Sequence, residues 1–552
     1  MNLHYLSDVS AASSAVYPTM AEAPFDAVQH FRSDVVVVHD ALDELSIHPT
    51  HDSAVLVAAG ARIAAQLPGL YPEDFGAPTF AATHGSRFDY VVGEMARGIA
   101  TTQMVSAAVR NGFCAFFGRA GLRRDVLDAA IATIRTDLGE FDGRNSRHRR
   151  ATAWGMNLIH SPDRPDRERE TVDLLLARAV TRASASAFMK LTADVTRYAC
   201  RGLTRLEDGS VKRRNFVFAK VSRPEVAAQF MRPAPPELLR ELAAAGLIDS
   251  HEAELAENIP VAEDITIESD SGGHTDNRPL VALFPVILRL RSDIANRYPQ
   301  ARAIRLGAAG GLATPHAVAA AFQLGADYVL TGSVNQCATE SGVSPKARAL
   351  LAEAGLADVA MAPAADMFEL GVKVQVLKRA TMFASKAQRL YDIYRHHDDL
   401  AALSPRDREW LERQVFRNSC EAEWELTRAY LTKTGSPFLA KAERDPKARM
   451  ALLFRRYLSQ GSQWARDGVE DRAIDFQIWC GPAMGAFNDW VRGSFLEPVA
   501  NRTVGQIGLN LLEGAAALTR FQQLRMAGVP LSPNAADFAP RPLALDWTDE
   551  AA

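Results

Sequence analysis

The sequence predicts an α/β barrel of eight parallel strands, each followed by a helix, with a small N-terminal cap and a large helical C-terminal extension. Two observations predict this fold. Short apolar or small-residue segments recur eight times in the middle of the chain, and most are separated by stretches of helical periodicity. The segments span residues 88–331, which matches the roughly 250 residues of a closed (β/α)8 barrel.

The first three expected strands are apolar or aromatic: Phe88–Val92, Phe113–Phe117 and Ala153–Ile159. The fourth, Ala183–Phe188, is so small and polar that it also suits the start of a helix. The last four are again apolar or β-branched: Phe216–Val221, Asp264–Glu268, Ala303–Leu306 and Tyr328–Thr331. Helical periodicity is clearest in the stretches between them, at Val105–Asn111, Arg123–Asp137, Glu168–Arg178 and Pro315–Leu324.

Three consecutive domains are expected: a cap over residues 1–78, the barrel over residues 79–340 and the extension over residues 341–552. In the cap we expect a strand at Val35–Val38 and a helix-like run at Ser53–Leu67. The extension is almost wholly helical in pattern, with amphipathic stretches at Ser344–Ala354, Ala384–His396, Pro405–Lys433 and Lys447–Asp467. An apolar run within residues 475–492 is expected to pack on the barrel or on a second copy in a homodimer.

Composition excludes several classes of protein. The chain has 552 residues, of which 47% are hydrophobic and 23% charged, as in an ordinary globular protein. Its 62 basic and 66 acidic residues leave a net charge of −4, so no global field would attract nucleic acid or an anionic membrane. The five cysteines have no disulfide or metal-ligand spacing, and neither a signal peptide nor a membrane span is evident, so we expect a cytoplasmic protein without a metal.

A candidate phosphate site lies in the seventh and eighth strand–helix units. Glycines end the seventh strand, Thr314 and Pro315 occupy the positions of an N-cap and a first helical residue, and Gly325 closes the helix. Glycines let backbone N–H groups approach a ligand, and a helix N-terminus favours an anion. The residues concerned are Gly307, Gly310, Gly311, Gly332 and Ser333, which predict a phosphorylated cofactor. The alternatives are glycines that only permit tight turns, and a dinucleotide-binding fold, whose GxGxxG spacing is not present.

His274 is the candidate acid or base. It follows the sixth strand on a loop with two glycines, so it is expected at the catalytic face of the barrel, where an imidazole exchanges protons near pH 7. The equally weighted alternative is a loop histidine bonded to Asp270 or Asp276. A metal site built from these three residues fits no calcium-loop template and has no second histidine.

Other strand ends supply further candidates. Ligand contacts are expected at Met95, Ala96, Gly118, Asn157 and Lys220. A polar side chain inside an apolar strand is either a ligand contact or an internal hydrogen-bond partner, and taken alone it is more often the latter. The basic clusters Arg144–Arg150 and Lys212–Arg214 are interpreted as solvated loops, or alternatively as a binding site for an acidic carrier protein or a 2′-phosphate. No serine-hydrolase elbow, P-loop or HExxH helix is present.

The motifs GEMARGIAT, GMNLIHSP, FAKVSRPEVA, ESDSGGHTDNRP, GAAGGLATP and TGSVNQ together resemble the PfaD-type family. These are trans-acting, flavin-dependent enoyl reductases of polyketide and polyunsaturated fatty acid synthases, related to nitronate monooxygenases. The resemblance covers nearly the whole chain beyond residue 80. It includes the tail motifs GVKVQVLKRATMF and FQIWCGPAMGAFNDWVRGSFLEP, which are the most specific. Glu94, Thr101 and Ala313 depart from residues that are common in the family.

The resemblance implies an FMN-binding barrel. Gly310, Gly311, Gly332 and Ser333 would hold the FMN phosphate, and Gly273, which precedes the histidine of the SGGH motif, would also contact the cofactor. The isoalloxazine and ribityl region would be lined by Met95, Ala96, Asn157 and Lys220. His274 matches a histidine that acts as a base in the related monooxygenases and would be an acid here.

The implied reaction transfers hydride from NADPH through FMN to the β-carbon of an enoyl thioester, which an acyl carrier protein of a polyketide or fatty acid synthase complex carries. His274, Lys220 or a water would protonate the α-carbon. The first alternative is a nitronate monooxygenase-like flavin oxidase. The second is a non-catalytic docking subunit of a synthase.

Overall fold

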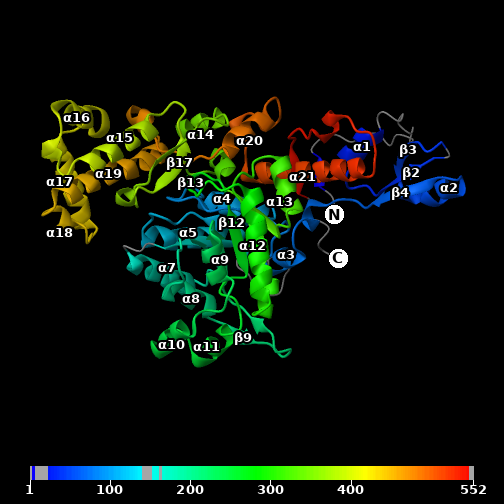
Figure 1. The fold of residues 1–552 in the computed structure, drawn as a ribbon, viewed down its shortest axis with the longest axis horizontal. Coiled ribbons are helices and arrows are strands. Elements are labelled where there is room, and N and C mark those ends of the chain that lie inside the picture. Colours follow the sequence, from blue (N-terminus) through cyan, green and yellow to red (C-terminus); the bar gives the residue numbers. More distant parts are fainter. Residues whose placement is uncertain (1–2, 6–22, 41, 140–151, 161–163, 546–552) are drawn as a thin grey trace. The chain divides into compact units, whose positions relative to one another are not determined.

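The computed structural model describes residues 3–5, 23–40, 42–139, 152–160 and 164–545, which Figure 1 draws as a coloured ribbon. The chain divides into two compact units. The first comprises residues 1–269, 279–341 and 489–552, and the second comprises residues 270–278 and 342–488. Division into three consecutive segments, at residues 78 and 340, stays a prediction. The basic cluster Arg144–Arg150 lies outside the described residues.

The predicted barrel is confirmed. Eight strands pair in parallel and close on themselves in the order β11, β12, β14, β15, β5, β6, β7, β8. Their bounds are β5 Tyr90–Val92, β6 Cys114–Phe117, β7 Trp154–Ile159, β8 Arg182–Ser186, β11 Phe216–Val221, β12 Asp264–Glu268, β14 Arg305–Ala309 and β15 Tyr328–Thr331. Each overlaps a segment expected from the sequence. The ambiguous fourth segment is a strand, β8, paired on both sides and almost wholly buried.

Helices pack on the outside of this barrel (Figure 1). The main ones are α4 Thr102–Arg110, α5 Arg124–Leu138, α7 Pro165–Ala177, α8 Ala193–Cys200, α9 Pro224–Phe230, α12 Leu280–Ala295 and α13 Pro315–Gln323. In α4, α8 and α13 a threonine hydroxyl at the N-cap accepts a hydrogen bond from a backbone N–H of the first turn. The Thr314 cap, Pro315 at the first helical position and Gly325 after the helix confirm the expected bounds of α13.

The N-terminal end of the barrel is closed by α3 (Pro78–His84) and a buried ionic network. Asp264 at the start of β12 accepts hydrogen bonds from Arg305 Nε at 2.6 Å and from His84 Nε2 at 3.1 Å. Arg182 Nε donates to His84 Nδ1 at 3.1 Å, so His84 is a neutral imidazole whose other nitrogen carries the proton. Burial lowers the pKa of His84 to about 4, against the opposing pull of Asp264.

Asp89, just before β5, is a buried carboxyl whose Oδ1 has no hydrogen-bond partner among the described residues. Burial raises its pKa to about 9, so the folded protein holds a proton there that the unfolded chain releases above about pH 4. The contribution of Asp89 to the free energy of unfolding therefore falls as pH rises between these two values. At pH 7 the cost is on the order of 4 kcal/mol.

We predict that Asp89→Asn stabilises the fold at pH 7.5 and flattens the dependence of stability on pH between 7 and 9. The amide keeps the size of the carboxyl but has no charge to bury. Urea unfolding at several pH values measures both effects. The matched control is Asp293→Asn, which makes the same change on the exposed face of α12 and is expected to alter neither. Equal pH dependence in Asp89→Asn and the natural chain would contradict the prediction.

The flanking parts of the first unit include a three-stranded antiparallel sheet of β2 (Val35–His39), β3 (Leu45–Pro49) and β4 (Arg62–Leu67). The expected helix over Ser53–Leu67 is wrong in its second half. The helix α2 is confined to Ser53–Ala58, and Gly60, with φ of 94°, turns the chain into β4. A buried helix, α21 (Val504–Met526), packs against α13 in the same unit.

The second unit contains a three-stranded sheet as well as helices. Strand β17 (Lys373–Leu377) pairs antiparallel with β16 (Val359–Pro363) and with β13 (Gly273–His274). The expectation of an almost wholly helical tail missed β16 and β17, whose alternating residues are masked by alanine-rich surroundings. Helices of the unit are α14 Pro345–Ala352, α15 Phe383–His396, α16 Pro405–Trp410, α17 Cys420–Lys433, α18 Leu439–Ala442 and α19 Pro446–Asp467.

The expected continuous stretch Pro405–Lys433 is broken by a π-helical turn at Leu411–Phe416, after which Arg417 adopts φ of 57°. Buried Asp475 organises this break, since its carboxylate accepts hydrogen bonds from Lys386 Nζ at 2.6 Å and from the Tyr457 hydroxyl at 2.9 Å. Lys386 in turn donates to a carbonyl of the π-turn. The turn is thus held by side chains distant in sequence, which periodicity does not reveal.

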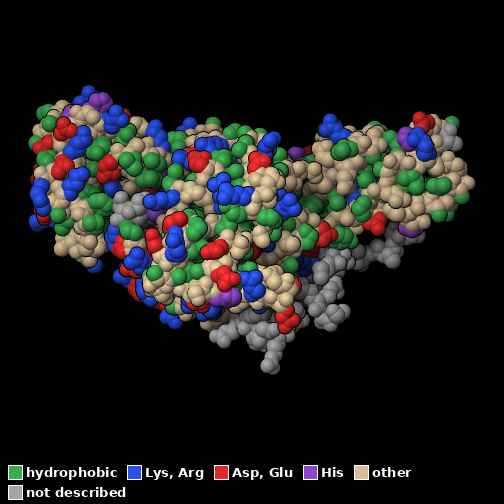
Figure 2. Space-filling view, turned by 60° about the horizontal axis from the view of Figure 1, so that its bottom comes forward, with side chains coloured by type: hydrophobic (Ala, Val, Ile, Leu, Met, Phe, Trp, Pro, Cys, Tyr) green, Lys and Arg blue, Asp and Glu red, His purple; other side chains and the backbone are tan. Residues whose placement is uncertain are grey.

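Acidic and basic side chains are interspersed over the face drawn in Figure 2, as the near balance of charge leads one to expect. Among the residues that the structure describes, no helix has both the length and the apolar character needed to cross a bilayer.

Candidate functional site

The candidate site of the first unit lies at the carboxyl ends of the barrel strands. All eight strands are parallel, so their carboxyl ends meet at one end of the barrel, where residues of several loops converge. The predicted residues at or just beyond these ends are Met95, Ala96, Gly118, Lys220, Gly310, Gly311, Gly332 and Ser333. Asn157 lies inside β7, two residues before its end.

Gly118 and Asn157 shape the loops after β5 and β6. A Cβ atom on Gly118 would lie 1.6 Å from the carbonyl oxygen of Met95, so only glycine fits there. Backbone hydrogen bonds join Gly98 N to Gly118 O and Gly118 N to Ala100 O. The Asn157 Oδ1 accepts from the Arg119 backbone N–H at 2.8 Å, and its side chain is buried. Asn157 therefore acts as an internal hydrogen-bond partner, while a contact with a cofactor stays a prediction.

The glycine cradle consists of Gly310, Gly311 and Gly332. Gly310 and Gly311 have φ of 85° and 72°, a backbone region that residues with a side chain rarely adopt. A Cβ on Gly311 or Gly332 would meet no atom within 4 Å, so both glycines border open space. Gly307 differs, because the Tyr328 ring fills the place of its missing side chain, which makes it a packing residue.

The cradle suits a phosphate group. It lies directly before the N-terminus of α13, whose unsatisfied N–H groups favour an anion. Ser269 Oγ donates to the carbonyls of Ala309 and Gly310 at 2.9 and 3.1 Å, which fixes the loop that carries the glycines. Gly514 of α21 allows close packing behind the same helix, since a Cβ there would lie 2.5 Å from the Pro315 ring. The open glycine edge and the helix terminus therefore fit the phosphate end of a cofactor such as FMN.

A polar cluster that the sequence analysis did not assemble lies at the same end of the barrel. The Lys220 Nζ lies 3.3 Å from Glu94 Oε1 and 3.2 Å from Glu268 Oε1. Ser186 Oγ donates to Glu94 Oε1 at 2.9 Å. Burial alone lowers the pKa of Lys220, but the carboxylates of Glu268 and Glu94 outweigh burial and raise it. Among these four residues only Lys220 was a predicted site residue, and Glu94 was noted only as a departure from a family pattern.

The SGGH segment belongs to the second unit. His274 and Gly273 form β13 on the edge of β17, and the His274 Nε2 lies 3.2 Å from Asp366 Oδ1 with half of its side chain exposed. Asp366 is itself exposed, and the hydrogen bond and charge of His274 lower its pKa. Asp366 was not anticipated, because 92 residues separate it from His274 in the sequence.

Gln375 holds the start of the SGGH segment. Its buried side-chain Nε2 donates to Asp270 Oδ1 and to the Ser271 carbonyl, both at 2.8 Å. Asn277 Nδ2 also donates to Asp270 Oδ1, so this carboxylate holds the loop together. Among the described residues there is no group of three or more histidine, cysteine, aspartate or glutamate residues suited to a metal ion.

The tail motif that begins at Phe476 packs on the other side of this segment. The Cys480 N–H donates to the Gln375 carbonyl at 3.3 Å, and Trp479 forms a bridge with Val376. A Cβ on Gly481 would lie 3.0 Å from the Gly272 nitrogen, so glycine permits the close approach. Three of the quoted motifs, which are far apart in the sequence, thus meet around β17.

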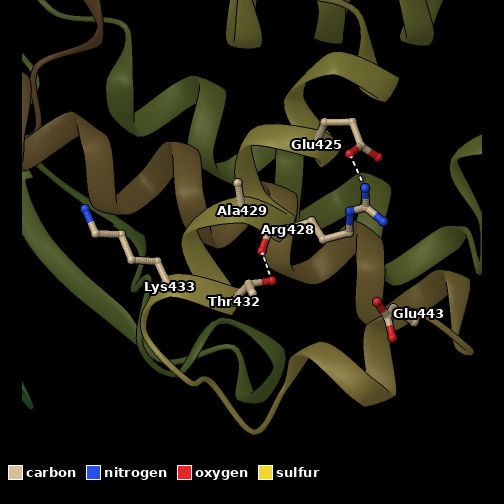
Figure 3. Close-up of a pocket in the computed structure, with 6 residues that line it drawn as sticks. All are labelled: Glu425, Arg428, Ala429, Thr432, Lys433 and Glu443. Carbon is tan, nitrogen blue, oxygen red and sulfur yellow. Dashed lines mark hydrogen bonds and ion pairs between the residues drawn. The ribbon is translucent and has the colours of Figure 1, made fainter.

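A surface hollow of about 490 Å³ lies on the helices α17 and α18 of the second unit (Figure 3). It is lined by Glu425, Arg428, Ala429, Thr432, Lys433 and Glu443. Arg428 is paired with Glu425 at 2.6 Å, and the lining carries two acidic and two basic side chains. Its charges are balanced and none of its lining side chains is a buried polar group. The hollow therefore does not resemble the predicted cofactor site.

The chain is similar to several proteins of known kind. It matches the crystal structure of the enoyl reductase domain of MlnA, from the macrolactin biosynthesis cluster of Bacillus amyloliquefaciens. The TM-score is 0.76 and the identity 36%, over 82% of this chain and 99% of that domain. It is 42% identical over 459 residues to a polyunsaturated fatty acid synthase subunit of Thraustochytrium sp.. It is 40% identical over 450 residues to the polyketide biosynthesis protein PksE of Bacillus subtilis.

The two curated relatives are longer than the matched segments. Each match takes in 82% of this chain, but only 30% of the Thraustochytrium protein and 57% of PksE. A family model described as the inserted helical domain of [acyl-carrier-protein] S-malonyltransferase matches residues 397–476, which fall within the helical part of the second unit.

Proposed function

Because the chain belongs to the PfaD-type family of enoyl reductases from polyketide and polyunsaturated fatty acid synthases, we propose that it reduces the α,β-double bond of enoyl thioesters on an acyl carrier protein. FMN and NADPH are the proposed cofactors. The acyl carrier protein and a synthase complex are the proposed partners.

The glycine cradle carries this proposal. Gly311 and Gly332 border open space, and Gly310 and Gly311 directly precede the N-terminus of α13, where backbone N–H groups can bind a phosphate. Ser333 begins the short 3₁₀ helix after β15 and adds a hydroxyl donor at the same end of the barrel. In the proposal these residues bind the FMN phosphate, and Met95, Ala96, Gly118 and Asn157 contact the rest of the cofactor.

FMN, when bound, supplies hydride transfer from NADPH to the β-carbon of the substrate. The protein residues position the reactants, exclude water and handle the proton and the developing negative charge. Lys220 is suited to a fixed positive charge, because Glu94 and Glu268 raise its pKa and oppose release of its proton. The proton for the α-carbon is therefore assigned to His274, paired with Asp366 and supported through Gln375.

An absorbance experiment tests this function. The purified protein is expected to show a flavin band that NADPH bleaches under anaerobic conditions and that a crotonyl thioester then restores. Parallel runs with NADH compare the two nicotinamide donors. Bleaching by a nitronate and restoration by oxygen, without a response to the thioester, would indicate a flavin oxidase instead. A colourless protein that cannot be reconstituted with FMN would support a non-catalytic docking subunit.

We predict that His274→Gln lowers turnover of the crotonyl thioester by about 10²- to 10⁴-fold, the range for loss of a general acid. FMN content and bleaching by NADPH are expected to stay unchanged, since neither requires the proton for the α-carbon. Single-turnover absorbance changes measure the two halves of the cycle separately. His396→Gln, the same change at the exposed end of α15, is the control. Full turnover in His274→Gln would remove this residue from the mechanism.

A further inference from the structure

The ion pair between Glu94 and Lys220 spans the barrel. Lys220 is on β11 and Glu94 follows β5, and three strands separate β5 from β11 in either direction around the closed sheet. The two side chains therefore meet across the interior, at the carboxyl end of the strands. With Glu268 at the end of β12 and Ser186 at the end of β8, they form what we call the cross-barrel clamp.

The cross-barrel clamp is buried but carries charge. The side chains of Glu94 and Lys220 are 5% and 13% exposed. Taking charges out of water is costly unless pairing and hydrogen bonds compensate for it. One Glu94 oxygen has such partners, but Glu94 Oε2 is buried and has no hydrogen-bond partner among the described residues. Buried carboxylate oxygens usually have a donor, so the missing donor at Glu94 Oε2 needs an explanation beyond closure of the barrel.

We propose that Glu94 is a positioning residue, which keeps the Lys220 ammonium permanently charged and fixed at the floor of the ligand site. Glu94 also makes the net charge of that floor negative. The inference rests on the proposed function for its consequence, since the ligand there is taken to be FMN and its substrate. The charged groups that act on Lys220 are Glu268 and Glu94. Two carboxylates around one ammonium leave an excess negative charge at this end of the barrel, where the glycine cradle also lies.

The first test uses the protein without cofactor. Lysine acetylation requires the neutral amine, so its rate at a given pH reports how firmly the proton is held. We expect Lys220 to be acetylated about tenfold faster in Glu94→Gln than in the natural chain at pH 9, which corresponds to a pKa lower by about one unit. Peptide mass spectrometry measures the rate, with exposed Lys190 in the same sample as internal reference.

Two further variants make the comparison specific. Glu268→Gln removes the other carboxylate and is expected to accelerate acetylation of Lys220 similarly. Glu237→Gln makes the same chemical change on an exposed helix and is expected to leave the rate unchanged. Glutamine keeps the size of glutamate, so a change in access to Lys220 does not account for the difference. Equal Lys220 rates in the natural chain, Glu94→Gln and Glu268→Gln would overturn the proposal.

The second test uses protein loaded with FMN. Glu94→Gln removes one negative charge from the end of the barrel that holds the cradle, so the midpoint potential of the bound flavin is expected to become more positive. Glu237→Gln is expected to keep the natural value. An unchanged potential in Glu94→Gln would show that the clamp does not act on the cofactor. If the natural chain binds no FMN, the proposed function fails, whereas the acetylation result still decides whether Glu94 fixes the charge of Lys220.

Discussion

Replacing Gly118 by alanine is expected to abolish FMN binding and to lower the free energy of unfolding by about 3 kcal/mol. The added Cβ atom would lie 1.6 Å from the carbonyl oxygen of Met95, a distance at which no two unbonded atoms can stay. The collision involves backbone and not the end of a flexible side chain. It can be relieved only by moving the loop after β5 away from the end of β6.

The effect on the cofactor follows from what this loop carries. Its backbone is bonded to Gly118 on both sides, through Gly98 and Ala100, and it presents Met95 and Ala96, which the sequence assigns to the flavin. Displacing it would also shift Glu94, whose carboxylate pairs with Lys220 across the barrel. Thermal unfolding and the quenching of FMN fluorescence on binding measure the two expected losses.

Gly332→Ala is the matched control. A Cβ atom at this position would meet no protein atom within 4 Å, so the loss of stability is expected to be much smaller than in Gly118→Ala. If the open space holds the FMN phosphate, affinity for FMN falls nonetheless. Equal stability of both variants would contradict the steric argument, and undiminished FMN affinity in Gly332→Ala would place the phosphate elsewhere.

The barrel was predictable because its strands carry their signal locally. Each of the eight expected segments, for example Phe216–Val221, is an apolar or small-residue run that must be buried on both faces, and helices with recognisable caps separate most of them. Even Ala183–Phe188, which resembled a helix start, was placed correctly by the regular alternation around it. The regular alternation of strands and helices along the chain therefore predicted the fold better than the composition of any one segment did.

The arrangement of the site was less predictable, because its contacts join residues that are distant in sequence. Lys220 was noticed as a polar residue in an apolar strand, but its partner Glu94 follows β5, which only closure of the barrel brings opposite β11. Its other partner, Glu268, ends the neighbouring strand β12, 48 residues further along the chain. In the same way, Gln375 reaches Ser271 only through the pairing of β17 with β13. Carboxylates at the ends of predicted strands were the available signal for the first cluster. No local pattern in the sequence marked the contact between Gln375 and Ser271.

Asp264→Ala is expected to destabilise the protein by about 3 to 5 kcal/mol, the usual cost of leaving a buried cation without its partner. Asp264 is fully buried at the start of β12, where it binds Arg305 through two hydrogen bonds and also pairs with His84. Burial raises the pKa of Asp264, but these two partners outweigh burial and lower it well below its usual range. Alanine leaves Arg305 and Arg182 charged in a closed end of the barrel.

A double-mutant cycle with Arg305→Met separates the ion pair from general loss of packing. If the pair is coupled, the variant with both changes loses less stability than the sum of the single variants, by at least about 1 kcal/mol. Additive losses would show that the two residues act independently.

The pH dependence of stability gives a second check on this network. Burial lowers the pKa of His84 to about 4. Between about pH 6.5 and 4 the unfolded chain therefore binds a proton on this residue that the folded protein does not bind. The contribution of His84 to stability is therefore expected to fall from pH 6.5 to 4, opposite in sign to that of Asp89, and His84→Asn is expected to remove this contribution, because asparagine takes up no proton in either state.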